Sequence, residues 1–138
     1  MVYKLTIFAI FLFSANAFAT KPPPDVIEQM EILASVEAAI KICTDSNEYM
    51  KMPATEALKF NDISMKSGDI IDLIQKKFND DLAYMAFITA SIKISESSQF
   101  RSKFAKTYSK KCSVQLLIDS NETINSVASR IKILLRKL

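Results

Sequence analysis

The stretch "DIIDLIQKKFNDDLAYMAFITASI", residues 69–92, decides the fold class of this chain. Its large apolar residues recur every three or four positions, which is the spacing of residues on one face of an α-helix. They are Ile71, Ile74, Phe78, Leu82, Met85, Ile88 and Ile92. We therefore expect one continuous helix of about six turns here, and the polar sequence "SESSQ" at residues 95–99 is expected to end it.

Residues that interrupt helices are scarce in the remainder of the chain. No proline follows Pro53, and Gly68 is the only glycine. The strands of an all-β protein are joined by frequent turn residues, so this scarcity favours helices. Composition and periodicity together predict an all-α protein, built as a small antiparallel bundle of four to five helices.

Two helices are expected before the central stretch. The first covers residues 26–44, with Asp25 as its N-cap and an apolar face at helical spacing. That face comprises Val26, Met30, Leu33, Val36 and Ile40. A short second helix is expected over residues 53–61. The sequence "NDISMKSGD" that follows is expected to be a connection in which Ser67 or Asp69 caps the next helix.

Two further helices are expected after the central stretch. One covers Phe100–Ile118, where Phe100, Phe104 and Tyr108 are four residues apart and share a face. The sequence "DSNE" is then expected to introduce a last helix over residues 123–138. Its apolar face comprises Ile124, Val127, Ile131, Leu134, Leu135 and Leu138.

The N-terminal region has the three parts of a secretory signal peptide. Lys4 precedes an apolar run at residues 5–13, and Ala17 and Ala19 supply the small side chains that flank a cleavage site. The alternative is a membrane anchor. Residues 5–19 are too few for it, since a transmembrane helix needs about 20 apolar residues.

We therefore expect residues 1–19 to be removed after Ala19, with Ala15 and Ala17 as a weaker alternative pair. The remaining residues 20–138 have the length of one helical domain. The product is expected to be exported, either to a periplasm or to the medium.

Cys43 and Cys112 are the only cysteines, and in an oxidising compartment an even number favours pairing. Lys110 and Lys111 beside a free Cys112 would favour a reactive thiolate. Thiolate enzymes usually need a histidine partner, however, and the chain has no histidine. We therefore predict a structural disulfide that joins the end of the first helix to the inside of the Phe100–Ile118 helix. The bond would close a loop of the 68 residues between the two cysteines, and closing a loop of that length stabilises a fold by roughly 4 kcal/mol.

Several kinds of catalytic site are excluded by what the sequence lacks. Without histidine there is no imidazole base and no histidine-containing zinc or haem site. A single glycine excludes a glycine-rich phosphate loop. The nearest carboxylate pairs, Asp69 with Asp72 and Asp80 with Asp81, are expected to be a helix cap and a solvated surface. We therefore expect no catalytic residue, no metal site and no cofactor, and a lysine-based or carboxylate-only active site is the alternative left open.

The sequence "NET", which begins at Asn121, fits the N-glycosylation sequon and is expected to lie in an exposed turn. In a eukaryotic host Asn121 would be a site for a sugar. In a bacterium it would only cap the last helix, and the sequence leaves both readings open.

Charge is divided unevenly along the chain. Residues 25–98 carry 13 acidic and 7 basic residues, whereas residues 99–138 carry 2 acidic and 9 basic residues. The simpler explanation is that basic helices pack beside acidic ones. The functional explanation is a basic surface that attracts an acidic protein partner. Its candidate binding residues are Lys103, Lys106, Lys110, Arg130, Arg136 and Lys137.

Two other partners are weighed against a protein. Aromatic residues lie among the bases, as in nucleic-acid-binding proteins, but Phe100, Phe104 and Tyr108 are expected to face the core. Export also disfavours nucleic acid. A membrane surface stays open, since the last helix is amphipathic and cationic and carries Ile133 on its polar side.

The sequence thus predicts an exported, non-enzymatic domain that binds another protein, as an inhibitor, an immunity factor or a chaperone does. The alternative is a membrane- or envelope-associated protein that acts through its cationic C-terminal helix.

Overall fold

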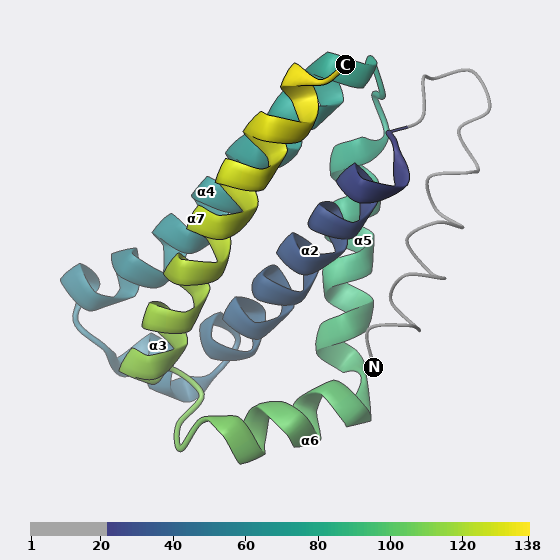
Figure 1. Cartoon of the computed structure of the whole chain (residues 1–138). Helices are drawn as coiled ribbons and strands as arrows, with labels where there is room; N and C mark the ends of the chain where they lie inside the picture. Colours follow the sequence, from purple (N-terminus) through teal and green to yellow (C-terminus); the bar gives the residue numbers. More distant parts are fainter. Residues whose placement is uncertain (1–21) are drawn as a thin grey trace.

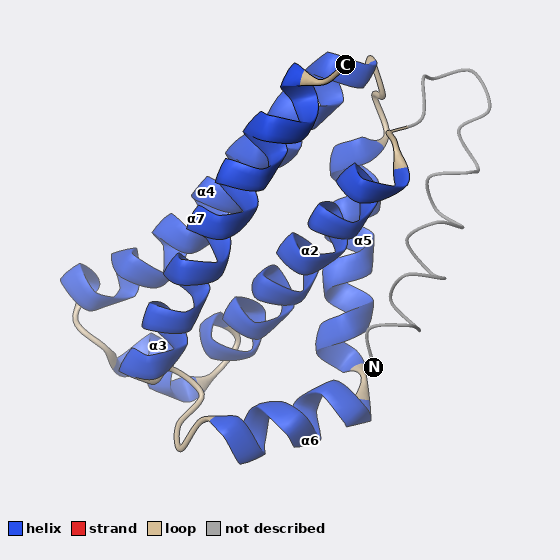
Figure 2. Ribbon diagram, in the orientation of Figure 1, coloured by secondary structure: helices blue, strands red, loops and turns tan. Residues whose placement is uncertain are grey.

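The computed structural model describes residues 22–138, and that part of the chain consists of helices and connections (Figures 1 and 2). The expected signal peptide and its cleavage site lie outside the described residues. The helices are α2 (Pro24–Thr44), α3 (Asn47–Lys51), α4 (Ala54–Phe78), α5 (Ala83–Glu96), α6 (Ser98–Thr107) and α7 (Val114–Arg136). The all-α prediction is confirmed.

Four long helices form the body of the molecule, and α3 and α6 lie near one end of it (Figure 1). Helix α2 packs against α4, α5 and α7, and α4 also packs against α5 and α7. Figure 1 shows that α2 and α5 run in one direction and that α4 and α7 run in the other. The neighbours α2 and α5 are therefore parallel, as are α4 and α7, so the bundle is not antiparallel throughout as expected.

Helix α2 is buried on most sides because it has three long helices as neighbours. All five residues of its predicted apolar face are buried, and so are Ala34, Ala38 and Ile42. The expected cap is wrong: Pro23 is the N-cap residue, and Asp25 lies exposed in the first turn. Proline suits the start of a helix because the first N–H groups have no partner within the helix.

Helix α4 begins at Ala54 and continues without a break to Phe78, so the connection expected at residues 61–69 is helical. Its buried face keeps the helical spacing across that stretch. The buried residues are Phe60, Ile63, Ser67, Ile71, Ile74 and Phe78. Neither Ser67 nor Asp69 is a cap. The helix also contains Gly68, although a side chain would fit there: an added Cβ would meet only the Tyr84 ring, at 3.7 Å. Burial of apolar residues on both sides of Gly68, such as Ile63 and Ile71, thus outweighs the low helix propensity of glycine and serine.

The continuous helix expected over residues 69–92 is wrong, because the chain breaks after Phe78. Asn79 is the C-cap and adopts a left-handed conformation with φ 49°, which asparagine tolerates better than most residues. The Oδ1 atom of Asp80 then accepts a hydrogen bond from the backbone N–H of Leu82 at 3.1 Å.

The break changes which side of the next helix is buried. Leu82, Met85 and Ile92, expected in the core, are 51%, 62% and 38% exposed. The core residues of α5 are instead Ala83, Ala86, Phe87, Ala90, Ser91, Ile94 and Ser95. A turn between two helices resets their rotation, and a periodic pattern read across the turn cannot detect this.

The C-terminal part also differs from the expected pattern. The helix expected over Phe100–Ile118 ends at Thr107, and α7 begins at Val114, so "DSNE" lies inside α7. The Oγ atom of Ser113 caps α7 by accepting the N–H of Leu116 at 3.1 Å. The buried residues of α7 are Leu116, Ser120, Ile124, Val127, Ile131 and Leu134. Leu135 is half-buried and Leu138 is exposed.

The predicted disulfide between Cys43 and Cys112 is confirmed, with an S–S distance of 2.06 Å. Cys43 lies in the last turn of α2, but Cys112 lies in the α6–α7 connection and not inside a helix. The bond joins residues 69 positions apart in the sequence. It therefore fixes the α6–α7 connection against the C-terminal end of α2.

Candidate functional site

The candidate site is a groove of about 380 Å³ between α2, α6 and α7. Its apolar lining comprises Ile32, Val36, Ala39, Phe100, Phe104 and Leu116. Its polar lining comprises Ser35, Lys103, Thr107, Tyr108, Asp119, Ser120 and Thr123. A concave site of this size that combines apolar and polar side chains is a candidate ligand or side-chain binding site. We call it the α2–α6–α7 groove.

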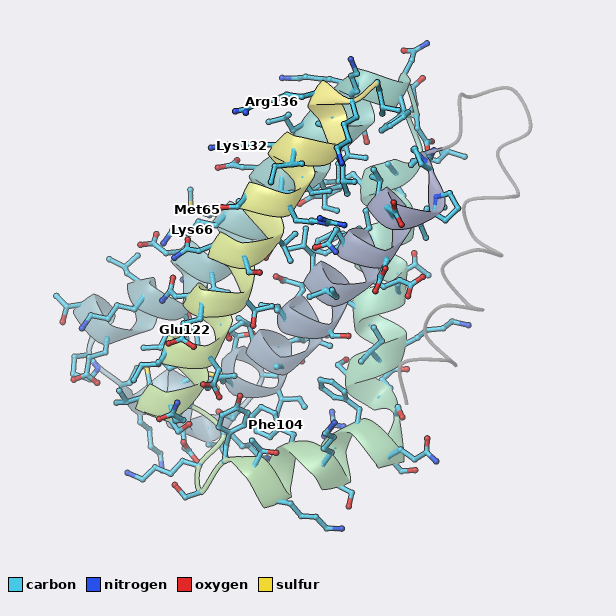
Figure 3. All side chains as sticks on the ribbon, in the orientation of Figure 1. Met65, Lys66, Phe104, Glu122, Lys132 and Arg136 are labelled. Carbon is cyan, nitrogen blue, oxygen red and sulfur yellow. A yellow bond between two sulfur atoms is a disulfide. The ribbon has the colours of Figure 1, made fainter. Side chains whose placement is uncertain are left out.

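The groove forms where α6 crosses the end of the bundle (Figure 1). Two buried aromatic side chains of α6 anchor this helix to the core. Phe100 and Phe104 are one turn apart on α6, and both are buried. Figure 3 shows Phe104 between α6 and the lower part of the bundle. Opposite them, α2 presents the small side chains of Ser35 and Ala39. Small residues facing large rings leave space that neither helix fills.

A hydrogen-bonded group lies at one side of the groove. The hydroxyl of Tyr108 donates to Oδ2 of Asp119 at 2.8 Å, and Nε2 of Gln115 donates to Oδ1 of the same carboxylate at 2.8 Å. Burial and the Asp119 carboxylate raise the pKa of Tyr108 to about 12. Tyr108 therefore stays neutral at physiological pH and remains a donor, while each oxygen of Asp119 already accepts one hydrogen bond.

Lys103 is the one lysine in the lining of this groove, and it is exposed. Within residues 22–138 its ammonium has no ion-pair partner. Asp119 is the carboxylate among the lining residues, and it accepts hydrogen bonds from Tyr108 and Gln115. The positive charge at the edge of the groove is therefore not neutralised by the described residues.

The six candidate binding residues do not form one surface. Lys103 and Lys106 lie on α6, and Lys110 follows in the α6–α7 connection. Arg130 and Arg136 lie in the C-terminal half of α7, with Lys137 directly after it. All are exposed. Figure 1 places α6 and the C-terminus at opposite ends of the molecule, and Figure 3 shows Arg136 with Lys132 at the C-terminal end. The structure thus brings the first three together and keeps them apart from the others.

Glu48 was not among the expected site residues, yet it holds the α6–α7 connection. Its two carboxylate oxygens accept the backbone N–H groups of Lys111 at 3.3 Å and Cys112 at 3.1 Å. Ser46, the N-cap of α3, also approaches the sulfur of Cys112 at 3.6 Å. No sequence pattern indicates these contacts, because they depend on the disulfide bringing α3 beside a distant connection.

Glu37 is a second group that sequence reasoning missed, and it lies between α2 and α4, outside the groove. Its Oε1 accepts a hydrogen bond from Ser64 at 3.0 Å, and its buried Oε2 has no hydrogen-bond partner among the described residues. Burial raises the pKa of Glu37, against smaller opposing effects of the Ser64 hydrogen bond and the Lys41 charge. A carboxylate within an otherwise apolar helix face gives no signal in the sequence.

Two expectations for the carboxylate pairs are wrong: Asp69 lies inside α4 and caps no helix, and Asp80 is buried and not on a solvated surface. Asp69 and Asp72 are exposed on α4, and Asp81 is exposed while Asp80 is buried in the α4–α5 turn. In the part of the chain that the structure describes, no three histidine, cysteine, aspartate or glutamate residues form a group that could hold a metal ion.

Asn121 lies within α7 and not in the exposed turn expected for it. Its Nδ2 donates to the carbonyl of Leu117 at 3.0 Å, and its Oδ1 accepts from Nζ of Lys66 at 3.3 Å. The side chain is therefore engaged by its own helix and by α4.

The fold and the groove define an all-α protein that is stapled by one disulfide and has an apolar groove with a polar edge. No helix in residues 22–138 is long and apolar enough to cross a membrane. Comparisons with protein-family models, curated proteins and solved structures find no match for the chain. Its function must therefore be argued from its own residues.

Proposed function

We propose that this chain is an exported, non-enzymatic binding protein whose α2–α6–α7 groove takes an apolar side chain of a protein partner. An inhibitor, an immunity factor and a chaperone all work in this way. The observation that carries the proposal is the groove itself. Phe100 and Phe104 line it together with apolar residues of α2 and α7 and with several polar side chains. Aromatic and apolar side chains combined with polar ones are usual in a protein interface.

The chemistry of the lining supports binding over catalysis. A nucleophile needs a neighbouring base or a lowered pKa. Tyr108 has a raised pKa and donates to Asp119, and the carboxylate of Asp119 is already hydrogen-bonded twice. Lys103 is exposed to solvent. These groups are suited to orienting a ligand.

The disulfide supports the exported location. Disulfides persist in oxidising compartments and are rare where thiols are kept reduced. The bond between Cys43 and Cys112 is compatible with the periplasmic or secreted location that the N-terminal sequence predicts.

Filling the groove tests the proposal. Ala39→Phe places a ring in the lining, whereas Ala105→Phe makes the same change at an exposed position of α6 outside the lining. The exported fraction of the native host is passed over each immobilised protein, and bound proteins are quantified by mass spectrometry. We expect a partner that is retained by the native and Ala105→Phe proteins and lost by Ala39→Phe. Equal retention by all three proteins would place the binding site elsewhere.

A second candidate function is association with a membrane surface through the C-terminal half of α7. Ile133 and Leu138 are 44% and 61% exposed there, among four basic residues. The burial of Ile131 and Leu134 weighs against it, because that apolar face is used by the bundle. Co-sedimentation with anionic vesicles but not with neutral ones would favour this candidate.

A further inference from the structure

We infer that the segment bound in the α2–α6–α7 groove is acidic, with a carboxylate that pairs with Lys103 beside the apolar side chain that enters the groove. The inference rests on the proposed function, since it names the chemistry of the partner at the same site.

The first support is the charge of the element that forms one wall of the groove. Residues 97–118 cover α6, the α6–α7 connection and the first turn of α7, and they contain no acidic residue. Their basic residues are Arg101, Lys103, Lys106, Lys110 and Lys111. An approaching segment therefore meets a positive potential on this side, which accelerates association with an anion.

The second support is that the acidic residues near this wall are already engaged. The two oxygens of Asp119 accept hydrogen bonds from Tyr108 and Gln115. The two oxygens of Glu48 accept the backbone N–H groups of the α6–α7 connection. These carboxylates therefore hold the structure together, and neither forms an ion pair with Lys103.

The third support is the position of Lys103 relative to the apolar lining. Lys103 directly precedes Phe104 on α6, and both side chains line the groove. A ligand whose apolar group lies against Phe104 therefore has its neighbouring groups within reach of the ammonium. The apolar contact supplies affinity, and the charge pair supplies orientation and selectivity.

The size of the groove favours a peptide segment over a lipid. A volume of about 380 Å³ lies at the small end of the range of ligand pockets, so the groove suits side-chain-sized groups and not the two acyl chains of a phospholipid. The exposed basic residues of the connection extend beyond the groove, as a contact with several residues of an acidic segment requires.

Peptide selection tests the inference. Short random peptides displayed on phage are selected on the native, disulfide-bonded protein, on Lys103→Glu and on Lys132→Glu. Lys132 is the matched control, because it is an exposed lysine on α7 that Figure 3 shows far from Phe104. Binding of each selected peptide to Ala39→Phe, in which the new ring fills the groove, is measured as well. Peptides that bind in the groove are those that Ala39→Phe does not bind. The peptide most enriched on the native protein is then synthesised, and its affinity for each protein is measured by fluorescence polarisation.

We expect enriched peptides to combine a large apolar residue with nearby aspartate or glutamate. Lys103→Glu should abolish that acidic preference and weaken the synthetic peptide by about three- to tenfold, whereas Lys132→Glu should change neither. The inference would be overturned by selected peptides that bind in the groove without acidic residues. It would also be overturned if peptides selected on Lys103→Glu were as rich in acidic residues as those selected on the native protein. Either result would leave the proposed function standing. Absence of any peptide that Ala39→Phe excludes would overturn both.

Discussion

At the scale of single residues, the contacts that the sequence did not predict are those between residues far apart in the chain. Glu48 binds a connection more than 60 positions away in the sequence, and the half-buried Glu37 accepts a hydrogen bond from Ser64 of another helix. Neither contact has a sequence signature, because helical periodicity reports only the face on which a residue lies. The disulfide could be predicted because two cysteines allow only one pairing, and because the absence of histidine disfavours a catalytic thiol.

Glu37 makes stability depend on pH. Because burial raises the pKa of Glu37 above its ordinary value of 4.5, the ionised side chain destabilises the folded state at neutral pH. That cost shrinks as pH falls through the raised pKa and is absent below 4.5, where the carboxyl is protonated in both folded and unfolded chains. Glu37→Gln should therefore raise the melting temperature relative to wild type at pH 7, and the gain should shrink near pH 4.

Thermal melts at several pH values, followed by circular dichroism, measure this difference. Glu28→Gln is the control, since Glu28 is exposed on the same helix. A Glu37→Gln gain that stays constant between pH 7 and pH 4 would show that the buried charge is not its cause.

At the scale of the elements, periodicity identified helical residues well and helix ends poorly. The face of α2 matched expectation, and that of the C-terminal half of α7 matched as far as Leu134, because both helices are long and uninterrupted. Residues 61–69 were misassigned because glycine and serine are typical of connections, whereas here Ile63 and Ser67 continue the buried face of α4. The turn after Phe78 was missed because it contains neither proline nor glycine and lies inside an apolar repeat.

The α4–α5 turn should depend on the left-handed conformation of Asn79. Asn79→Ala is expected to lower the free energy of unfolding by about 1 kcal/mol, because a Cβ without a compensating polar group is disfavoured at positive φ. Asn79→Gly should be nearly neutral. Urea denaturation of the two variants provides the comparison, and equal stability of both would argue against a left-handed residue at this turn.

Helix α7 should be part of the core and not a detachable arm. Ile131→Ala removes a side chain that is 2% exposed and should cost roughly 2–5 kcal/mol. Ile133→Ala changes the same residue type at a 44% exposed position two residues away and should cost far less. Denaturant unfolding distinguishes them, and similar small losses for both would mean that α7 leaves the bundle without unfolding it.

At the scale of the whole molecule, the parallel pairing of α2 with α5 and of α4 with α7 requires α6 to cross the end of the bundle (Figure 1). That crossing creates the groove, and it could not be predicted from the sequence. The site depends on the turn between Thr107 and Val114, which falls inside the single helix expected over Phe100–Ile118. Charge alone pointed to Lys103, but it grouped that residue with arginines at the other end of the molecule.

The disulfide is the covalent link that holds this arrangement. Replacing Cys43 and Cys112 together by alanine should lower the free energy of unfolding by roughly 2–5 kcal/mol, because the unfolded chain is no longer constrained. Urea denaturation of the native and double-alanine proteins measures the loss. An unchanged denaturation midpoint with an unchanged slope would contradict the expected role of the bond.

The central claim, that the α2–α6–α7 groove binds the partner, is tested most directly by mapping contacts in solution. The ¹⁵N- and ¹³C-labelled protein is titrated with the acidic peptide selected on it, and backbone and methyl shifts are followed by NMR. We predict the largest changes at Ile32, Ala39 and Leu116 and along α6 around Lys103. Changes confined to the C-terminal half of α7, around Lys132 and Arg136, would contradict the claim.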